Sequence, residues 1–171
     1  QGVISATIDD YEETVLDLFS DEDYREDLFP VGRLDKDTEG LLVITNDGAL
    51  SHRLLSPKRH VPKEYYVQVS GCLTKEDQAK MAAGLKIDGG EICLPAELKI
   101  LTVDESEQTS TAQLILHEGK FHQVKRMMQA CGKTVTYLQR IRMGNLTLPE
   151  NLALGEYRAL TAEELDLLQQ K

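Results

Sequence analysis

The amino-acid sequence predicts an α+β fold, in which helices flank a mixed and largely antiparallel sheet. Two features of its hydrophobic pattern carry this prediction: segments that alternate apolar and polar residues follow one another in runs, and a few segments with helical spacing lie among them. The chain of 171 residues is long enough to bury a sizeable core, and it contains no internal repeat and no Gly/Ser linker. We therefore expect one compact domain over residues 1–171.

Strands are expected where apolar residues alternate, or where a short apolar run is rich in branched side chains. The run LLVIT predicts a buried strand, and YYVQV predicts another that is entered through Pro62. Two segments in the middle of the chain alternate like neighbours in an antiparallel pair. The expected strands cover residues 41–45, 65–69, 96–103, 111–117, 136–142 and 157–160.

Helices are expected where apolar residues recur every three or four positions behind a capping residue. They are predicted over 12–19, after a cap at Asn46 or Asp47, over 74–85, up to Gly132, and from Thr161 onward. The helix that ends at Gly132 has a wide apolar stripe, made of Phe121, Val124, Met127, Met128 and Cys131. The helix after Asp47 should turn one face inward, made of Leu50, Leu54 and Leu55.

The composition excludes several classes of protein. Hydrophobic residues make up 41% and charged residues 28% of the chain, which excludes wholesale disorder. No apolar run approaches the roughly 20 residues that span a bilayer, and the first residues lack the pattern of a secretory signal. The three cysteines are scattered without a CxxC pair, which favours reduced thiols over a disulfide framework or a zinc site. We expect a cytoplasmic protein with no membrane partner.

The formal net charge of -10 is distributed unevenly along the chain. Ten acids and one base lie within the first thirty residues, whereas the windows 119–149 and 48–63 contain no acid. Those two windows hold ten of the nineteen Lys and Arg residues. A polyanion responds to the local field within a Debye length, about 8 Å at physiological salt. The two windows therefore predict surfaces that bind an anionic ligand.

Several metal and nucleotide motifs are incomplete. Residues 35–40 match the first half of a calcium loop, but Asn46 stands where a bidentate Glu is required. His117 and His122 are five positions apart rather than four, so they do not share the helix face that holds zinc. The chain also lacks the GxxxxGK[ST], GxGxxG and GxSxG motifs. We expect no metal and no small-molecule cofactor.

Three segments with chemistry-bearing residues remain. GRLDKDTEGLLVITNDG (32–48) carries Asp35 beside a tight turn, VPKEYYV (61–67) carries a lysine and an aromatic at the start of a strand, and EGKFHQVKRMM (118–128) is a basic helix. In this order, and followed by LQRIRMGNLTL (138–148), they resemble the RsuA-like family of bacterial ribosomal pseudouridine synthases. The resemblance covers nearly the whole chain. It implies the pseudouridine synthase catalytic fold, with a central active-site cleft.

The resemblance implies roles for individual residues. Asp35 matches the catalytic aspartate of the family, and Tyr65 matches the tyrosine that packs on the target base. Lys125, the fourth residue of HQVK, matches the basic residue that pairs with the aspartate, and Arg126 is the alternative if that register slips by one. The other candidates for substrate binding are expected to flank the aspartate, cap the helix or contact phosphates: Arg33, His122 and Arg140.

The same resemblance implies the substrate and partners. The HQVK form is similar to the branch that acts on the small ribosomal subunit, whereas large-subunit members tend to carry an Asn-Arg pair there. We therefore expect 16S ribosomal RNA, free or in an assembling small subunit, as the partner of a monomer. Family members usually begin with a small S4-type RNA-binding domain and a strand, and we expect both upstream of residue 1.

Three alternatives stay open at this point. The first is a large-subunit (23S) pseudouridine synthase, and the second is a non-catalytic RNA-binding module in which Asp35 is structural. The third is a glycoside hydrolase that uses Asp35 and Glu39 as an acid/base pair, which requires two carboxyl groups roughly 5–10 Å apart across a sugar cleft.

Overall fold

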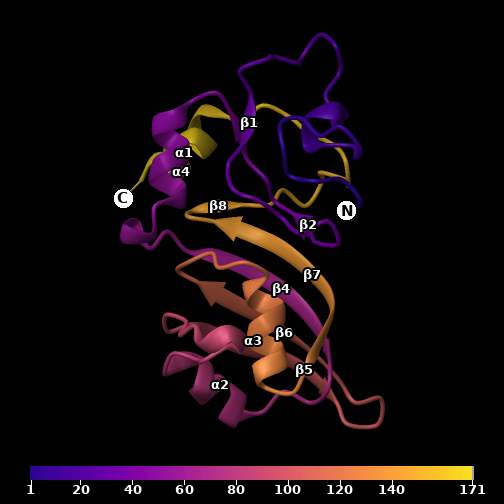
Figure 1. Cartoon of the computed structure of the whole chain (residues 1–171), viewed down its shortest axis with the longest axis vertical. Coiled ribbons are helices and arrows are strands. Elements are labelled where there is room, and N and C mark those ends of the chain that lie inside the picture. Colours follow the sequence, from indigo (N-terminus) through magenta and orange to yellow (C-terminus); the bar gives the residue numbers. More distant parts are fainter. Residues whose placement is uncertain (171) are drawn as a thin grey trace. The chain divides into compact units, whose positions relative to one another are not determined.

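The computed structural model describes residues 1–170, which form two compact units (Figure 1). The first unit consists of Gln1–Val61 together with Arg142–Lys171, and the second consists of Pro62–Ile141. The architecture confirms the predicted α+β class with an antiparallel-rich sheet. That residues 1–171 act as one catalytic domain stays a prediction.

The second unit contains a sheet whose strands lie in the order β7-β4-β6-β5. These are β4 (Lys63–Ser70), β5 (Glu97–Asp104), β6 (Thr109–Leu116) and β7 (Thr134–Met143). β6 pairs antiparallel with β4 on one side and with β5 on the other, and a bulge interrupts the β5 register after Ile100. The strands predicted around 65–69, 96–103, 111–117 and 136–142 are thereby confirmed.

Two helices bury one face of this sheet (Figure 1): α2 (Lys75–Ala82) and α3 (Gln123–Ala130), with the short 3-10 helix η3 (Asp88–Gly90) between them in sequence. Thr74 caps α2 as predicted, because its side chain accepts a hydrogen bond from the backbone of Asp77. Gly84 then ends the helix with φ +92°, where a Cβ would lie 3.0 Å from the Cys93 carbonyl oxygen. The core combines sheet and helix side chains, among them Val67, Val69, Leu114, Met81, Val124, Met127, Met128 and Leu138.

The prediction is wrong for one residue of the α3 stripe. Val124, Met127, Met128 and Cys131 are buried as expected, but the Phe121 side chain is 76% exposed. The helix begins at Gln123, and His122 before it has the left-handed backbone conformation, with φ 48°. Helical spacing cannot be extended back across such a residue, so Phe121 does not continue the buried face.

The first unit has little regular structure. Its strands have two residues each: β1 (Phe29–Pro30), β2 (Glu39–Gly40), β3 (Ile44–Thr45) and β8 (Leu146–Thr147). Its helices are η1 (Val15–Leu18), α1 (Gly48–Leu55), η2 (Pro57–Arg59) and α4 (Ala162–Gln169). Asp47, one of the two predicted caps, caps α1, and Thr161, where a helix was expected to begin, caps α4. The core of this unit is made of Val31, Leu41, Val43, Leu50, Leu54, Met143, Leu146 and Leu168.

Three predictions for the first unit need correction. The run 41–45 buries Leu41 and Val43, but only its last two residues form a strand, β3, paired with β1. Residues 157–160 form no strand, and the Tyr157 side chain bonds through its hydroxyl to Ser20 and Asp23. Leu55 is 40% exposed rather than buried. Among residues 1–170, no helix has the length and apolar character needed to cross a membrane.

The burial of Met127 on α3 predicts how much this helix contributes to the stability of the second unit. Met127→Ala should lower the free energy of unfolding by roughly 2–5 kcal/mol, because Met127 is 0% exposed and truncation leaves a cavity. Leu101→Ala, on β5 and 40% exposed, is the control and should cost about 0.5 kcal/mol. Urea denaturation followed by circular dichroism measures both values. Equal losses would contradict the packing of α3 against the sheet.

Candidate active site

Asp35 lies in a turn of the first unit whose backbone is held on both sides. The amide of Thr38 donates to the Asp35 carbonyl at 2.8 Å. Ahead of it, the amide of Leu34 donates to the Ser5 hydroxyl oxygen at 3.0 Å. The amide of Gly2 donates to the Lys36 carbonyl at 2.7 Å. The N-terminal residues thus brace the turn that presents the half-buried Asp35, a requirement for a carboxylate that must meet a substrate in one orientation.

Two further charged residues flank Asp35 in the sequence. Arg33, a predicted substrate contact, is exposed two positions earlier. Lys36 forms an ion pair with Glu12, with Nζ 2.7 Å from Oε2. Arg33 is therefore available to solvent, whereas Lys36 fastens the turn to the acidic N-terminal segment.

Tyr65 lies on the helix-covered face of the sheet in the second unit. Successive residues of a strand point to opposite faces, so Lys63, Tyr65, Val67 and Val69 of β4 share one face. Val67 and Val69 belong to the core, and Tyr65 is half-buried against it. Tyr66 faces the other way, where its ring meets Tyr137 edge-on with centroids 6.1 Å apart. The structure therefore distinguishes the two tyrosines of the motif.

Arg140 of the neighbouring strand β7 donates a hydrogen bond to the Tyr65 hydroxyl. The side chain of Arg140 is almost completely buried, at 3% exposed, and Lys63 is 8% exposed. Desolvation disfavours a charge, so burial lowers the pKa of Arg140, while its interaction with Tyr65 acts in the opposite direction. Burial, and then the positive charge of Arg140, lower the pKa of Lys63. Two cations and one phenol hydroxyl thus form a compact buried group.

The burial of Arg140 corrects its predicted role. We predicted a phosphate contact on a basic surface, but a guanidinium that is 3% exposed and bonded to Tyr65 is withdrawn from solvent. Alternation along β7 explains this: Arg140 shares the face of Leu138, which belongs to the core. Arg140 holds Tyr65 and is not a surface contact for phosphate.

Arg126 is committed to the loop around η3. Its Nε lies 2.6 Å from Asp88 Oδ1, its Nη2 lies 2.7 Å from Glu91 Oε1, and its Nη1 donates to the Phe121 carbonyl at 2.9 Å. The hydrogen bonds to Asp88 and Glu91 raise the pKa of Arg126. Because every nitrogen of the guanidinium is used locally, we do not keep Arg126 as the alternative partner of Asp35. Lys125, half-buried one position earlier, remains the predicted partner.

The acid-free window 119–149 is partly neutralised in three dimensions. Lys120 lies 3.7 Å from both Glu91 and Glu118, and Lys133 lies 3.3 Å from Asp77. Arg142 donates to the Gly144 carbonyl at 2.7 Å. Together with Arg126 and the buried Arg140, most bases of the window therefore have partners inside the protein. The predicted phosphate-binding surface is therefore reduced, because three of its six bases, Lys120, Arg126 and Lys133, lie beside acids.

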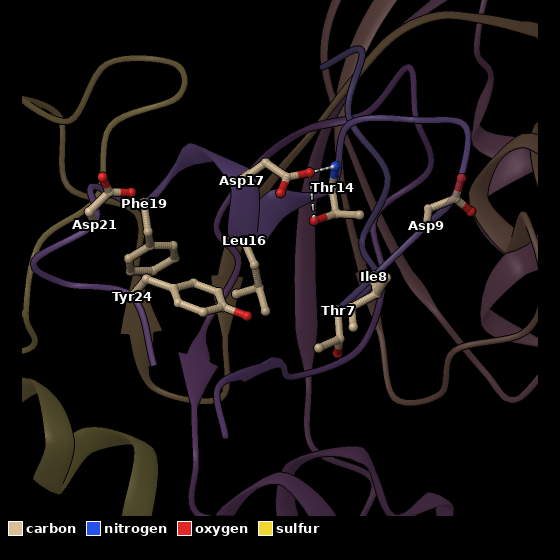
Figure 2. A pocket seen from close by; sticks show the side chains of 9 residues that line it. All are labelled: Thr7, Ile8, Asp9, Thr14, Leu16, Asp17, Phe19, Asp21 and Tyr24. Carbon is tan, nitrogen blue, oxygen red and sulfur yellow. Dashed lines mark hydrogen bonds between the residues drawn. The ribbon is translucent and has the colours of Figure 1, made fainter. Parts of the chain in front are cut away.

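The pocket shown in Figure 2 is separate from the candidate active-site residues. It has a volume of about 250 Å³ and is lined only by residues between Thr7 and Tyr24 of the first unit. Its acids are engaged locally: Asp9 accepts from the amides of Tyr11 and Glu12, and Asp17 accepts from Thr14. None of the predicted site residues lines it, and its negative charge disfavours an RNA phosphate. Within residues 1–170, no cluster of His, Cys, Asp and Glu could hold a metal ion.

Two contributors to the site were missed by the sequence predictions. The sequence marks Lys63 as a base at the start of a strand but assigns it no place in the site, although strand alternation puts it on the face of Tyr65. Gln123 was not considered at all, yet it is 4% exposed and links the start of α3 to the preceding loop. Its Oε1 accepts from the Lys120 amide at 2.8 Å, and its Nε2 donates to Glu118 at 2.9 Å. The position of an amide directly before a helical apolar stripe was the available signal.

Comparisons with known proteins agree on one class. The family model described as RNA pseudouridylate synthase matches residues 1–130. An uncharacterized RNA pseudouridine synthase of Bacillus subtilis is 51% identical over 168 residues, which cover 98% of this chain and 70% of that protein. The chain also superposes on a crystal structure of a pseudouridylate synthase with a TM-score of 0.88 and 37% identity, covering 98% of this chain and 70% of that one.

Two further relatives carry more specific names. The ribosomal small subunit pseudouridine synthase A of Vibrio vulnificus is 41% identical, over 97% of this chain and 70% of its own length. The ribosomal large subunit pseudouridine synthase B of Bacillus subtilis is 40% identical, over 98% of this chain and 68% of its own length. The fold and these matches define an isomerase of RNA uridines. The chain belongs to the RNA pseudouridylate synthase family.

The buried Lys63 predicts a specific pH dependence of stability. The pKa of Lys63 in the folded protein lies below its usual 10.5. Between these two values the unfolded chain binds more protons than the folded one, so the contribution of Lys63 to stability rises with pH. Lys63→Met should remove that rise, and its stability relative to the unmodified chain should therefore decline as the pH increases from 7 to 10.5.

Urea denaturation at a series of pH values measures this difference. Lys99→Met, which replaces an exposed lysine of β5, is the matched control and should follow the unmodified chain. If the two variants have the same pH profile, Lys63 does not carry the predicted burial cost.

Proposed function

We propose that the protein isomerises a uridine of ribosomal RNA to pseudouridine, and that the RNA is that of the small subunit (16S). The observation that carries the proposal is the family match over residues 1–130, which contains the Asp35, Tyr65 and Lys125 segments in the expected order. Membership of an isomerase family also argues against the hydrolase and against the non-catalytic RNA-binding module. We propose that the chain acts as a cytoplasmic monomer, on free RNA or on an assembling subunit.

The reaction requires a carboxylate that is held in one orientation. The N1–C1′ bond of uridine breaks, a C5–C1′ bond forms, C5 loses its hydrogen as a proton and N1 gains one. Positive charge develops on the sugar as the glycosidic bond breaks, and a carboxylate beside it stabilises that charge or attacks the sugar carbon. We assign this role to Asp35. Because a desolvated carboxylate needs a nearby cation to stay ionised, we assign Lys125 as its partner.

The detached uracil must turn without leaving the site. An aromatic ring stacked on a base contributes roughly 1–3 kcal/mol, which suits Tyr65 for the task. The hydrogen bond from the buried Arg140 gives the Tyr65 ring one orientation before substrate arrives. Arg140 is in this proposal a positioning residue, because it acts on the uracil through Tyr65.

The choice of the small subunit rests on the HQVK segment at 122–125. Relatives named for each subunit match this chain at nearly equal identity, 41% and 40%. Overall similarity therefore does not favour either subunit, and the segment that lies at the start of α3 carries the distinction. The experiment must compare both RNAs.

Tritium release tests the reaction directly. Ribosomal RNA labelled with tritium at uridine C5 should lose its label to water with this chain, because the new C–C bond expels that hydrogen. Asp35→Asn should release no label above background while still binding RNA, since it removes the negative charge and keeps the shape. Asp37→Asn, two positions on in the same turn, is the matched control and should retain release.

The two subunit RNAs are assayed in parallel. Release from 16S and not from 23S RNA supports the whole proposal, whereas release from 23S alone overturns the choice of subunit. Equal release by Asp35→Asn and the unmodified chain would show that Asp35 is not the catalytic carboxylate.

Arg140→Met tests whether Arg140 orients Tyr65. We expect kcat to fall on the order of 100-fold because the base is misplaced, with RNA affinity and its salt dependence within about twofold of the unmodified chain. Lys133→Met, which breaks the ion pair with Asp77, is the control and should lower stability without changing kcat. A variant of Arg140 with normal kcat and a flatter salt dependence would restore the phosphate role.

A further inference from the structure

A stacked aromatic pair stands on the surface at the start of α3. The Phe121 side chain is 76% exposed, although burial of such a ring is favourable. Its ring stacks on that of His122, with centroids 3.8 Å apart and an interplanar angle of 15°. His122 contacts one face of the Phe121 ring, and the exposure of Phe121 leaves the rest of the ring to solvent.

The backbone that carries the pair is held in place before any ligand binds. The Phe121 carbonyl accepts from Arg126 Nη1 at 2.9 Å, and Arg126 is itself anchored on Asp88 and Glu91. On the other side, the buried Gln123 accepts from the backbone amide of the residue before Phe121. A platform that is already ordered loses little conformational entropy when a ligand stacks on it.

The pair also lies near the end of the sheet that carries Tyr65. Leu116, the last residue of β6, is the partner of Lys63 at the start of β4, two positions from Tyr65. The chain continues from Leu116 into the loop that reaches Phe121 five residues later. Two bases next to the pair, Lys120 and Arg126, are each bound to acids. The surface at the pair itself therefore offers an RNA strand chiefly an aromatic face.

We propose that Phe121 and His122 form a stacking platform for an unpaired RNA base close to the isomerised uridine; this inference rests on the proposed function. The substrate chemistry is a single-stranded or unstacked nucleotide, since RNA loops are recognised through bases stacked on aromatic side chains. Every base has a π-face, so the platform positions the strand without selecting its sequence. It supplies affinity and register that the partly neutralised basic window does not.

Tryptophan fluorescence tests the contact. The chain contains no tryptophan, so Phe121→Trp introduces a single fluorophore that can still stack. Titration with a single-stranded 16S RNA fragment that contains uridines should quench its emission, at the concentration where filter binding shows complex formation. Tyr11→Trp, at a position that is 96% exposed in the first unit, is the matched control and should keep its emission. RNA binding without quenching at position 121 overturns the platform.

Phe121→Leu and Phe121→Tyr test the energetic contribution. The leucine variant should bind the fragment roughly five- to 150-fold more weakly, and the tyrosine variant should bind like the unmodified chain. Tritium release by the unmodified chain is measured on the same RNA. If it releases label and Phe121→Leu equals it in affinity and kcat/KM, the platform fails and the proposed function stands. If it releases none but position 121 is quenched, the proposed function fails and the platform stands.

Discussion

The burial of Arg140 and Lys63 beside Tyr65 is a constraint that the sheet of the second unit must accommodate. Withdrawing a guanidinium and an ammonium from water costs several kcal/mol per ion, and here Arg140 and Lys63 lie side by side in that situation. Strand alternation places both on the face of Tyr65, and the core of the sheet continues beside them at Val67. A phenol fixed in this way is preorganised, which a base that must turn in place requires.

The fold, rather than the order of residues along the chain, determines which charged side chains lie together in this protein. The window around α3 contains no acid, yet the fold brings Asp88, Glu91 and Asp77 to its bases. The pairs with Asp88 and Glu91 fasten α3 to the loop around η3, and the pair with Asp77 holds Lys133 after α3 against α2. The exposed aromatic pair at Phe121 then becomes the most distinctive feature of the region. An acidic protein can in this way bind RNA through stacking as well as through charge.

Much of the fold could be predicted because local signals agreed with tertiary packing. The caps at Asp47, Thr74 and Thr161 and the alternation in β5 and β6 needed only neighbouring residues. The strand expected at 157–160 is absent, because its alternating residues find no neighbouring strand to pair with within residues 1–170. For the site, family motifs marked Asp35 and Tyr65, but the partners of Arg126 and the burial of Arg140 depend on residues far along the chain. No periodicity within one segment encodes such pairs.

We propose that Asp35 and Tyr65 act on the same uridine. The most direct measurement is a crystal structure of the Asp35→Asn variant bound to a 16S RNA fragment that supports tritium release by the unmodified chain. We expect the target uracil to stack on the Tyr65 ring, with the side chain at position 35 within about 3–3.5 Å of the sugar, the distance of a reacting pair. A uracil bound away from Tyr65, or a sugar out of reach of position 35, would contradict the account.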